Sequence, residues 1–435
     1  MTYSQALEYI HALHRFSRKP ELDRMRLLLR KLGDPQKRLK FVHLAGTNGK
    51  GSTTVMLAAI LRHAGYHVGC YTSPFVLDFR ERIVLDGEMI SENELAALTA
   101  EVAEKAAEVE AELEAPREFE FITAIALLYY SRRPCDIVAL EVGLGGRFDA
   151  TNAIDPPLAA VICPIGLDHT ELLGDTLAAI AGEKCGIIKP GSMVVTGGYQ
   201  QPEALDVIVE SCRKADCPLT MGQPSQLHIT QTGLTGSTFT YHGHPFTVSL
   251  VGQHQVRNAM TAIDTALVLD ASGFSVPLPA IAAGVKDAFI PGRLEVFSPP
   301  PREGVRAKTV LLDGAHNPHG MAALRESIFA AGVAPQIAVV GMLADKDCAD
   351  ALDIIAPFLQ QLIVTTPNSP RALPAAELAV LAKPYCNRIT VEPDCKKAVE
   401  LALASTDKTV LIFGSLYLVS QVRPMLCPKP HTPPR

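Results

Sequence analysis

The sequence predicts an α/β fold in which helices cover a mostly parallel β-sheet. Short apolar runs of strand length alternate with helical patterns along most of the 435 residues. Several of these runs are apolar at every position, as parallel strands are when both of their faces are buried. A glycine-rich turn joins the first run, 41–45, to a helix-like stretch at 53–64.

Five strands, several helices and one antiparallel section are expected in the N-terminal part. The strand-like runs are 41–45, 68–71, 136–142, 159–165 and 193–196. Ser91 and Glu94 have the spacing of a capping box and open a long helix rich in Ala and Glu. Alternating Thr, aromatic and Gly residues over 226–251 predict antiparallel hairpins. Further helices are expected at 175–188, 255–271 and 277–289.

A proline-rich segment divides the chain. Residues 298–304 contain Pro299, Pro300 and Pro301 before a charged tip, which is typical of a linker. The predicted domains are therefore 1–297 and 305–435, with 298–304 between them. The second domain repeats the α/β pattern and is predicted to be Rossmann-like, with strands at 309–313, 337–342, 362–366, 388–391 and 410–413. The proline-rich tail from 428 is expected to be frayed.

Composition restricts the partners and the compartment. The formal net charge of −6 argues against a nucleic-acid partner, and no apolar run reaches the roughly 18 residues that span a bilayer. The first residues lack the apolar core of a signal peptide. None of the ten cysteines forms a Cys-x-x-Cys pair, which favours reduced thiols and argues against a zinc site. We therefore expect a cytoplasmic monomer that acts on small molecules and has no membrane partner.

The turn Gly46-Thr47-Asn48-Gly49-Lys50-Gly51-Ser52 carries the clearest functional signal. A strand, a glycine-rich loop and a helix form a phosphate cradle, because loop N–H groups and the helix N-terminus point at the anion. Lys50 would reach the outer phosphates, and Ser52 would lie near a bound Mg²⁺. The general P-loop pattern is not met, since Leu44 takes the place of its first glycine and Gly51 follows the lysine. We predict a P-loop-type mononucleotide-binding domain; a glycine turn without a ligand is the alternative.

Polar residues follow several other apolar runs, where ligands bind in a doubly wound sheet. Glu141 ends one run before a glycine-rich stretch, and a carboxylate there suits a phosphate-bound Mg²⁺. His169 follows another run as a candidate metal ligand or base, and Ser73 follows a third as a metal or substrate ligand. The structural alternatives are a helix-capping Glu, a structural His and a Ser-Pro turn. The pattern around Lys184 alone indicates a solvated surface lysine.

Three residues of the later half are weaker candidates for nucleotide contacts. Asn258 offers an amide to an adenine edge, and Arg293 offers a guanidinium fork to phosphates. Asp313 offers a carboxylate to a ribose hydroxyl. For each of them the sequence leaves a purely structural role equally open.

Taken together, these motifs resemble the folylpolyglutamate synthase and dihydrofolate synthase branch of the Mur ligase superfamily. The resemblance runs from about 22 to 417, nearly the whole chain. Its most specific part is the stretch 141–152, and the Gly51 insertion is also typical of this branch. Other matching stretches are 46–52, 119–123, 168–174, 183–184, 258–259, 291–295, 313–318 and 414–417. Two positions depart from the family pattern, with Phe75 in place of a histidine and Cys185 in place of an alanine.

The resemblance implies a role for each matching residue. ATP would be bound by Thr47, Asn48, Gly49, Lys50, Gly51, Ser52, Asn258, Arg293 and Asp313. Mg²⁺ would be held by Ser52, Ser73, Glu141 and His169. Contacts on the pterin side of the substrate would come from Glu120, Phe121, Arg147, Phe148, Asp149 and Ala150. Catalysis would involve Lys50, His169, Lys184 and His316, and the resemblance implies a carbamylated Lys184, which would overturn its surface interpretation.

The implied reaction is an ATP-dependent amide ligation that adds L-glutamate to the γ-carboxylate of a folate, such as tetrahydrofolate, through an acyl phosphate. Dihydropteroate is a second implied acceptor of glutamate, because both activities occur in this branch on similar motifs. One alternative is a Mur-type ligase acting on a peptidoglycan precursor, against which Gly51 and the stretch 141–152 argue. The other is a non-catalytic nucleotide-binding switch protein, which the many polar strand ends disfavour.

Overall fold

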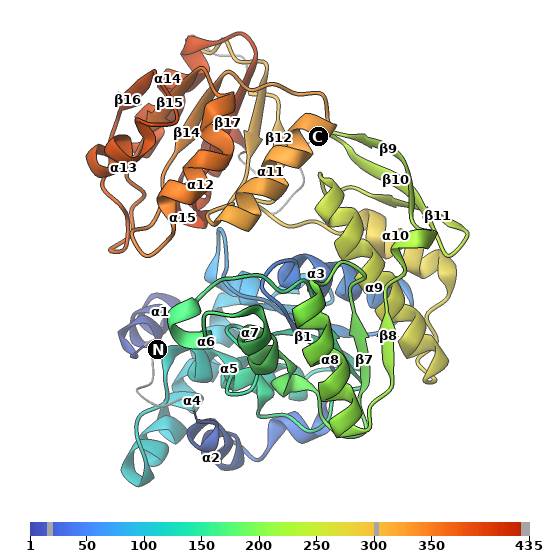
Figure 1. Cartoon of the computed structure of the whole chain (residues 1–435). Coiled ribbons are helices and arrows are strands. Elements are labelled where there is room, and N and C mark those ends of the chain that lie inside the picture. The colour runs from blue at the N-terminus through green and yellow to red at the C-terminus, as the bar shows by residue number, and fades with distance from the viewer. Residues whose placement is uncertain (15–20, 300–303, 428–435) are drawn as a thin grey trace. The chain divides into compact units, whose positions relative to one another are not determined.

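The computed structural model describes residues 1–14, 21–299 and 304–427 (Figure 1). Two expectations lie outside these residues, namely the centre of the linker at 300–303 and the frayed tail from 428. The chain forms two compact units, Met1–Gln226 with Arg257–Ala288 and Leu227–Val256 with Phe289–Arg435. Each unit has its own apolar core and is described by itself.

The first unit is built on an eight-stranded sheet with the order β4-β3-β2-β5-β1-β6-β7-β8. Its strands are β1 Phe41–Ala45, β2 Val68–Tyr71, β3 Ile83–Leu85, β4 Glu88–Met89, β5 Ile137–Glu141, β6 Ala159–Ile162, β7 Met193–Thr196 and β8 Leu219–Met221. All neighbours from β2 to β8 pair in parallel, and only β3 and β4 pair in the antiparallel sense. The prediction of a mostly parallel sheet is confirmed.

One strand ends earlier than its apolar pattern suggests. The sequence predicts a strand up to 165, but β6 ends at Ile162. Pro164 has no N–H to give to a ladder. Its carbonyl oxygen instead accepts hydrogen bonds from the backbone N–H groups of Thr47 (2.9 Å) and Asn48 (3.3 Å). The residues after β6 therefore support the glycine-rich turn that follows β1.

Helices cover both faces of this sheet. The helices of this unit are α1 Tyr3–Ala12, α2 Asp23–Lys31, α3 Lys50–His63, α4 Glu92–Glu112, α5 Glu118–Ser131, α6 Thr170–Leu173, α7 Leu177–Lys184, α8 Pro202–Ala215, α10 Leu278–Asp287 and, from Arg257 on, α9 Gln253–Ala271. Phe41 and Ala45 share one face of β1, since side chains alternate along a strand. Phe41 belongs to an apolar cluster with residues of α1, α2, α4 and α5, and Ala45 belongs to a second cluster with residues of α7 and α8 (Figure 1). The connection from β1 through α3 to β2 runs along the sheet in the direction opposite to the connections through α7 and α8. Because such connections are right-handed, α3 lies on the other face of the sheet.

The second unit contains two sheets. The antiparallel one, β9 (His228–Gly233), β10 (Gly236–Tyr241) and β11 (His244–Val248), confirms the predicted antiparallel section. The other has the order β12-β13-β17-β14-β15-β16 and is parallel except for β12. Its strands are β12 Glu295–Phe297, β13 Thr309–Leu312, β14 Ile337–Val340, β15 Gln361–Val364, β16 Ile389–Val391 and β17 Thr409–Phe413. Its helices are α11 Pro318–Ala330, α12 Cys348–Ile355, α13 Ala375–Ala382, α14 Cys395–Ser405 and α15 Leu416–Leu426.

The compact units divide the chain at other points than the predicted domains 1–297 and 305–435. The second unit takes in 227–256 and begins again at Phe289, ahead of the proline-rich segment. Strand β12 lies before that segment but pairs with β13 behind it. The carboxylate of Glu295 in β12 is also bound by the buried guanidinium of Arg423 in α15, at 2.8 Å. These contacts explain why the residues just before the linker pack with the C-terminal sheet.

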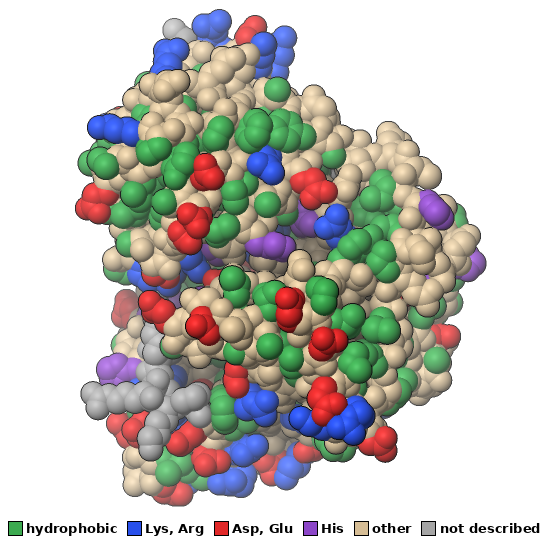
Figure 2. Space-filling view, in the orientation of Figure 1, with side chains coloured by type: hydrophobic (Ala, Val, Ile, Leu, Met, Phe, Trp, Pro, Cys, Tyr) green, Lys and Arg blue, Asp and Glu red, His purple; other side chains and the backbone are tan. Residues whose placement is uncertain are grey.

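Three general properties follow from the described residues. No helix in the ranges given above is long and apolar enough to cross a membrane. All ten cysteines lie within the described ranges and are free thiols. On the face shown in Figure 2, basic and acidic side chains are interspersed over the surface.

Candidate active site

Helix α3 begins directly behind the glycine-rich turn, at the carboxyl end of β1. Its first residue is Lys50, and Gly49 precedes it with a φ of +80°, a left-handed conformation that favours glycine. A Cβ at this position would also overlap the side-chain oxygen of Asn258 from α9. Gly49 is therefore required both by the backbone conformation and by the close approach of Asn258.

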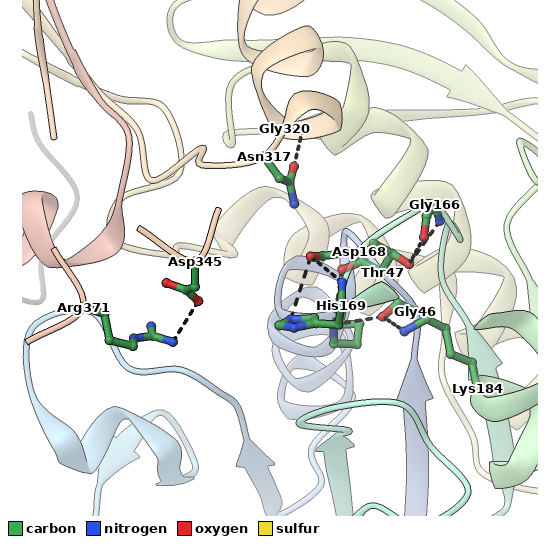
Figure 3. Close-up of polar contacts among 11 residues, drawn as sticks. Gly46, Thr47, Gly166, Asp168, His169, Lys184, Asn317, Gly320, Asp345 and Arg371 are labelled. Carbon is green, nitrogen blue, oxygen red and sulfur yellow. Dashed lines mark hydrogen bonds and ion pairs between the residues drawn. The ribbon is translucent and has the colours of Figure 1, made fainter. Parts of the chain in front are cut away.

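The first half of the turn is fixed by the segment after β6. The Thr47 hydroxyl donates to the Gly166 carbonyl oxygen (3.0 Å) and accepts from the Gly166 N–H (3.1 Å), as Figure 3 shows. The backbone N–H groups of Thr47 and Asn48 both donate to the Pro164 carbonyl oxygen, so these two N–H groups are used within the protein. The first turn of α3 supplies N–H groups that have no acceptor inside the helix, and these suit an anion.

Two ammonium groups meet at one carbonyl oxygen of the turn. Nζ of Lys50 and Nζ of Lys184 each donate to the Gly46 carbonyl oxygen at 2.9 Å, and Lys50 also donates to the Thr47 carbonyl at 3.3 Å. Figure 3 shows Lys184 reaching Gly46 from the end of α7. Only 4% of Lys184 is exposed. Burial, and next the charge of Lys50, lowers the pKa of the Lys184 ammonium to about 7.

The interpretation of Lys184 as a solvated surface lysine is therefore wrong. Lys184 is the last residue of α7, and a short 3-10 turn, Cys185–Ile187, follows it. At Gly146 a Cβ would lie 2.8 Å from the Lys184 carbonyl oxygen, so the glycine-rich stretch packs directly on this helix end. The helical pattern could not reveal a contact with residues so far away in the sequence. A cation that is buried beside a second cation is a typical property of a functional site.

The two lysines line a small hollow together with two other loops. Its walls are Gly46, Thr47, Lys50, Gly143, Leu144, Gly145, Asp168, His169, Leu173 and Lys184. His169 has a φ of +50° and precedes the short helix α6. Its N–H donates to Oδ1 of Asp168 (3.0 Å), and its Nε2 lies 3.9 Å from the same oxygen. The structure thus brings three predicted site residues, His169, Lys50 and Lys184, to one hollow that suits an anionic group.

Glu141 lies at the end of β5, beside the start of α3. Its carboxylate is buried, and Oε2 accepts the Ser73 N–H at 2.9 Å. The same oxygen lies 3.5 Å from the position of a Cβ on Gly51, the residue next to Ser52. The structure therefore brings Glu141 and Ser73 next to the first turn of α3, which carries Ser52. These are three of the four residues predicted to hold Mg²⁺.

This set of donors fits Mg²⁺. Among the residues that the structure describes, no group of three or more His, Cys, Asp and Glu side chains could hold a metal ion. Mg²⁺ is typically bound by one or two carboxylates together with phosphate oxygens and water. Glu141 beside a phosphate cradle offers that arrangement.

Asp149 organises the glycine-rich stretch after Glu141. Its Oδ2 accepts the Leu144 N–H (2.9 Å), and its Oδ1 accepts both the N–H (3.0 Å) and the hydroxyl (2.5 Å) of Thr151. Burial raises the pKa of the Asp149 carboxyl, and these donors act in the opposite direction. Asp149, predicted as a substrate contact, therefore has a structural function in this loop.

The neighbours of Asp149 differ in how accessible they are. Phe148 is 44% exposed, whereas Ala150 is buried. The guanidinium of Arg147 donates to the Gly182 carbonyl (3.0 Å) and lies 3.4 Å from the Glu183 carboxylate. Of the three, Phe148 and Arg147 have surface that a ligand can reach.

Two other predicted substrate residues are engaged in the fold. The oxygens of Glu120 bind the Arg24 guanidinium at 2.8 and 2.9 Å, and Oε2 also accepts the Arg117 N–H at 2.7 Å. Phe121 has no exposed surface, and its ring centroid lies 5.4 Å from that of Tyr9. The Arg24 partner is 96 residues away in the sequence, so no local pattern indicates this ion pair.

The remaining predicted residues lie at the end of β13 in the second unit. Asp313 is buried and accepts the N–H groups of Leu294 and Ala315, each at 2.7 Å. Burial raises the pKa of its carboxyl, and the charge of Arg293 partly offsets this. Nδ1 of His316 lies 2.8 Å from the Gly314 carbonyl oxygen. Asp313 thus joins the loop that carries Arg293 to the loop that carries His316.

Sequence reasoning missed two residues that contact the loops around the site, Gln200 and His43. The Gln200 amide lies within hydrogen-bonding distance of the carbonyl oxygens of Ile162 and Cys163 (3.2 and 3.0 Å) and accepts the Ile165 N–H (3.1 Å). It thereby holds the segment that bonds the glycine-rich turn, and no sequence pattern marks it. His43 is buried in β1, and its signal was visible as the one polar residue in the apolar run 41–45.

Two known sequence families match most of the chain. Residues 44–266 match the Mur ligase middle domain. Residues 292–416 match the glutamate ligase domain of Mur ligases. The two matches cover the glycine-rich turn in the first unit and the Arg293 and Asp313 loops in the second.

Individual relatives are similar over nearly their whole length. The chain is 35% identical over 434 residues to the dihydrofolate synthase/folylpolyglutamate synthase of Bacillus subtilis, covering 98% of this chain and 99% of that protein. It is 36% identical over 442 residues to the folylpolyglutamate synthase of Lacticaseibacillus casei, with coverage of 98% and 99%. Its structure is similar to that of Mycobacterium tuberculosis folylpolyglutamate synthase complexed with ADP and AMPPCP, with a TM-score of 0.88, 30% identity and coverage of 98% and 99%.

Proposed function

This chain belongs to the folylpolyglutamate synthase and dihydrofolate synthase family of Mur ligases, and we propose that it uses ATP to join L-glutamate to the γ-carboxylate of a folate. The observation that carries the proposal is the position of Lys50 at the start of α3, where its ammonium group donates to the Gly46 carbonyl oxygen in front of the helix N-terminus. One cation and a set of helix N–H groups suit the phosphates of a nucleotide. The alternative of a peptidoglycan precursor as substrate is not favoured by the relatives.

The reaction needs two bond-forming steps. A carboxylate oxygen of the folate attacks the γ-phosphorus of ATP, and ADP leaves with the electron pair of the broken P–O bond. The amine of glutamate then attacks the acyl phosphate, inorganic phosphate departs, and the nitrogen loses a proton. Lys50 would neutralise negative charge on the transferred phosphoryl group. The turn 46–52 would hold ATP in the orientation that the reaction needs, without forming a covalent bond to it.

Mg²⁺ is the metal that we assign to this site. Glu141 would hold it, with Ser52 and Ser73 beside it and His169 at the rim of the adjoining hollow. When bound, Mg²⁺ supplies positive charge that offsets the charge of the phosphate oxygens. The Ser73 N–H keeps the Glu141 carboxylate oriented toward the start of α3.

Lys184 is proposed to be carbamylated in the active enzyme. Carbamylation joins the amine nitrogen to the carbon of CO₂ and releases a proton, so it requires the neutral amine. Burial and the neighbouring Lys50 favour that form, because they lower the pKa of Lys184 to about 7. The product would turn a buried neutral amine into an anion beside the Lys50 ammonium, which places two opposite charges next to each other.

Contacts of the other predicted residues with ligands are also part of the proposal. Asn258 of the first unit and Arg293 and Asp313 of the second are proposed as ATP contacts, and His316 is proposed to act from the loop after Asp313. Phe148 and Arg147 have accessible surface and are the substrate contacts that the geometry supports best. Dihydropteroate is a second candidate acceptor of glutamate, supported by relatives that are named dihydrofolate synthase/folylpolyglutamate synthase.

Release of ADP with different acceptors tests the proposed reaction. We expect ADP release that requires both L-glutamate and a reduced folate, and a parallel assay with dihydropteroate decides whether it is a substrate. Lys50→Ala should abolish turnover, whereas Lys105→Ala, which removes a half-buried lysine of α4 paired with Glu108, should leave it unchanged. Turnover of a UDP-muramoyl acid without turnover of any folate or pteroate would reject the proposal.

A further inference from the structure

A buried histidine lies behind the glycine-rich stretch and has no place in the reaction described above. His43 is the middle residue of β1 and has no exposed surface. It faces the same side of the sheet as Phe41 and Ala45 and therefore lies between the two core clusters to which they belong. Its Nε2 lies 2.8 Å from the hydroxyl oxygen of Thr151, while Nδ1 is buried and has no hydrogen-bond partner among the residues that the structure describes. Burial lowers the pKa of the ring to about 3, so the imidazole is neutral.

The direction of the hydrogen bonds follows from the chemistry of the three side chains. The Thr151 hydroxyl has one proton, and it donates this proton to Oδ1 of Asp149 at 2.5 Å. The hydroxyl oxygen of Thr151 has no second proton to give, so it can only accept a hydrogen bond from His43. This places the imidazole proton on Nε2. The result is a continuous series from His43 through Thr151 to Asp149, in which each bond polarises the next toward the carboxylate.

Asp149 transmits this restraint to the wall of the lysine hollow. Its second oxygen accepts the Leu144 N–H, and Leu144 lines the hollow together with Gly143 and Gly145. Gly145 has a φ of +69°, and neither glycine has a side chain that could anchor the stretch by packing. The Leu144 N–H bond to Asp149 therefore holds the stretch 143–145 at its centre, while Phe119 packs closely on Gly143 at its start.

We propose that His43 and Thr151 are positioning residues for the ligation reaction. They hold Asp149 in place, and Asp149 holds the stretch 143–145 against the hollow that Lys50 and Lys184 line. Neither residue touches ATP or the reacting carboxylate; their effect passes through the backbone of Leu144. The inference rests on the proposed function for its kinetic consequence, but its structural consequence can be measured without any substrate.

Four variants and a control test this inference. His43→Leu and Thr151→Val each break the series, Thr151→Ser keeps the hydroxyl, and the double variant His43→Leu/Thr151→Val removes both links. The control is Thr265→Val, because Thr265 is equally buried but its hydroxyl donates only to the Thr261 carbonyl of its own helix (2.7 Å). Circular dichroism and thermal unfolding establish that each variant is folded.

Hydrogen exchange of the substrate-free enzyme is the first measurement. We expect the Leu144 amide to exchange at least about tenfold faster in His43→Leu and Thr151→Val, with no such change in Thr265→Val or in peptides of the second unit. The kcat of ADP release should fall about tenfold or more, while KM for ATP changes less than about threefold, because small displacements of a site cost rate. Thr151→Ser should restore kcat, and the double variant should be no worse than the poorer single variant.

Several results would overturn the inference. Unchanged exchange at Leu144, or exchange that rises equally throughout the first unit, would assign His43 to general packing. Additive losses of kcat in the double variant would show that the two residues act separately. If the wild-type enzyme turns over no folate, the proposed function fails, and exchange at Leu144 still decides whether the positioning series exists.

Discussion

Replacing Lys184 by methionine should remove one specific pH dependence from the stability of the first unit. The pKa of Lys184 is about 7 in the folded protein and 10.5 in an unperturbed chain. At a pH between these two pKa values, Lys184 is protonated in the unfolded chain and neutral in the folded protein. Stability therefore rises with pH through this window, and below pH 7 the full cost of burying the ammonium group is present.

The size of the effect follows from a difference of one proton. The slope is about 1.4 kcal/mol per pH unit, so the stability of the wild type should rise by about 2 kcal/mol relative to Lys184→Met between pH 8 and pH 9.5. Other groups titrate in the same range, among them Lys189, but the subtraction of the variant from the wild type removes their contribution. The buffers must be free of CO₂, because a carbamate would replace the ammonium equilibrium.

Urea unfolding at several pH values measures this slope. The chain has no tryptophan, so circular dichroism or tyrosine fluorescence follows the transition. Lys105→Met serves as the control, since the hydrogen bond to Glu108 raises the pKa of Lys105 and its removal should leave the wild-type slope unchanged in this pH range. Parallel curves for the wild type and Lys184→Met would refute the reasoning, because they would mean that the buried amine keeps its ordinary pKa.

Three further predictions concern other parts of the account. Gly49→Ala should weaken ATP binding at least about tenfold in calorimetry, since a Cβ would overlap Asn258 and strain the left-handed backbone. Arg423→Met should lower the free energy of unfolding by about 3–5 kcal/mol in denaturant titrations, and Glu295→Gln in the same chain should recover part of this loss, because the single variant leaves a buried charge unpaired. Nitrogen NMR should find His43 neutral with its proton on Nε2 down to pH 5, and stability should fall as the pH drops from 6.5 toward 3, where the unfolded chain alone binds the proton.

Each of these predictions can be contradicted by its own measurement. Wild-type affinity of Gly49→Ala for ATP would mean that the turn does not hold the nucleotide as described. An additional loss of stability in the double variant would show that Arg423 and Glu295 do not form a coupled pair. A His43 resonance that titrates near its ordinary pKa would place that ring in contact with water.

The sequence predicts the sheet of each unit well because the signals for strands and turns are local. The apolar run 41–45 and the turn after it indicate β1 and α3, and the Thr-rich alternation of 226–251 indicates the antiparallel sheet. It also predicts that Lys50, Glu141 and Ser73 lie near one another, because parallel strands place their carboxyl ends at one edge of a sheet.

Features that depend on distant contacts are beyond the reach of local patterns. Lys184 is buried only because Gly46 lies across from the end of α7, and Glu120 binds Arg24 across 96 residues. The extent of the second unit depends on the pairing of β12 with β13 and on the bond between Glu295 and Arg423, and neither has a sequence signature. His43 could have been noticed as a polar residue in a buried strand, but its partner Thr151 could not.

Transfer of oxygen from the folate to phosphate tests the central claim most directly. The substrate is a reduced folate whose γ-carboxylate carries a heavy isotope of oxygen, incubated with the enzyme, ATP and L-glutamate. Ligation through an acyl phosphate predicts that each released phosphate contains one labelled oxygen, detected by mass spectrometry, and that no label is transferred by Lys50→Ala. Amide product that forms while the phosphate remains unlabelled would contradict the account.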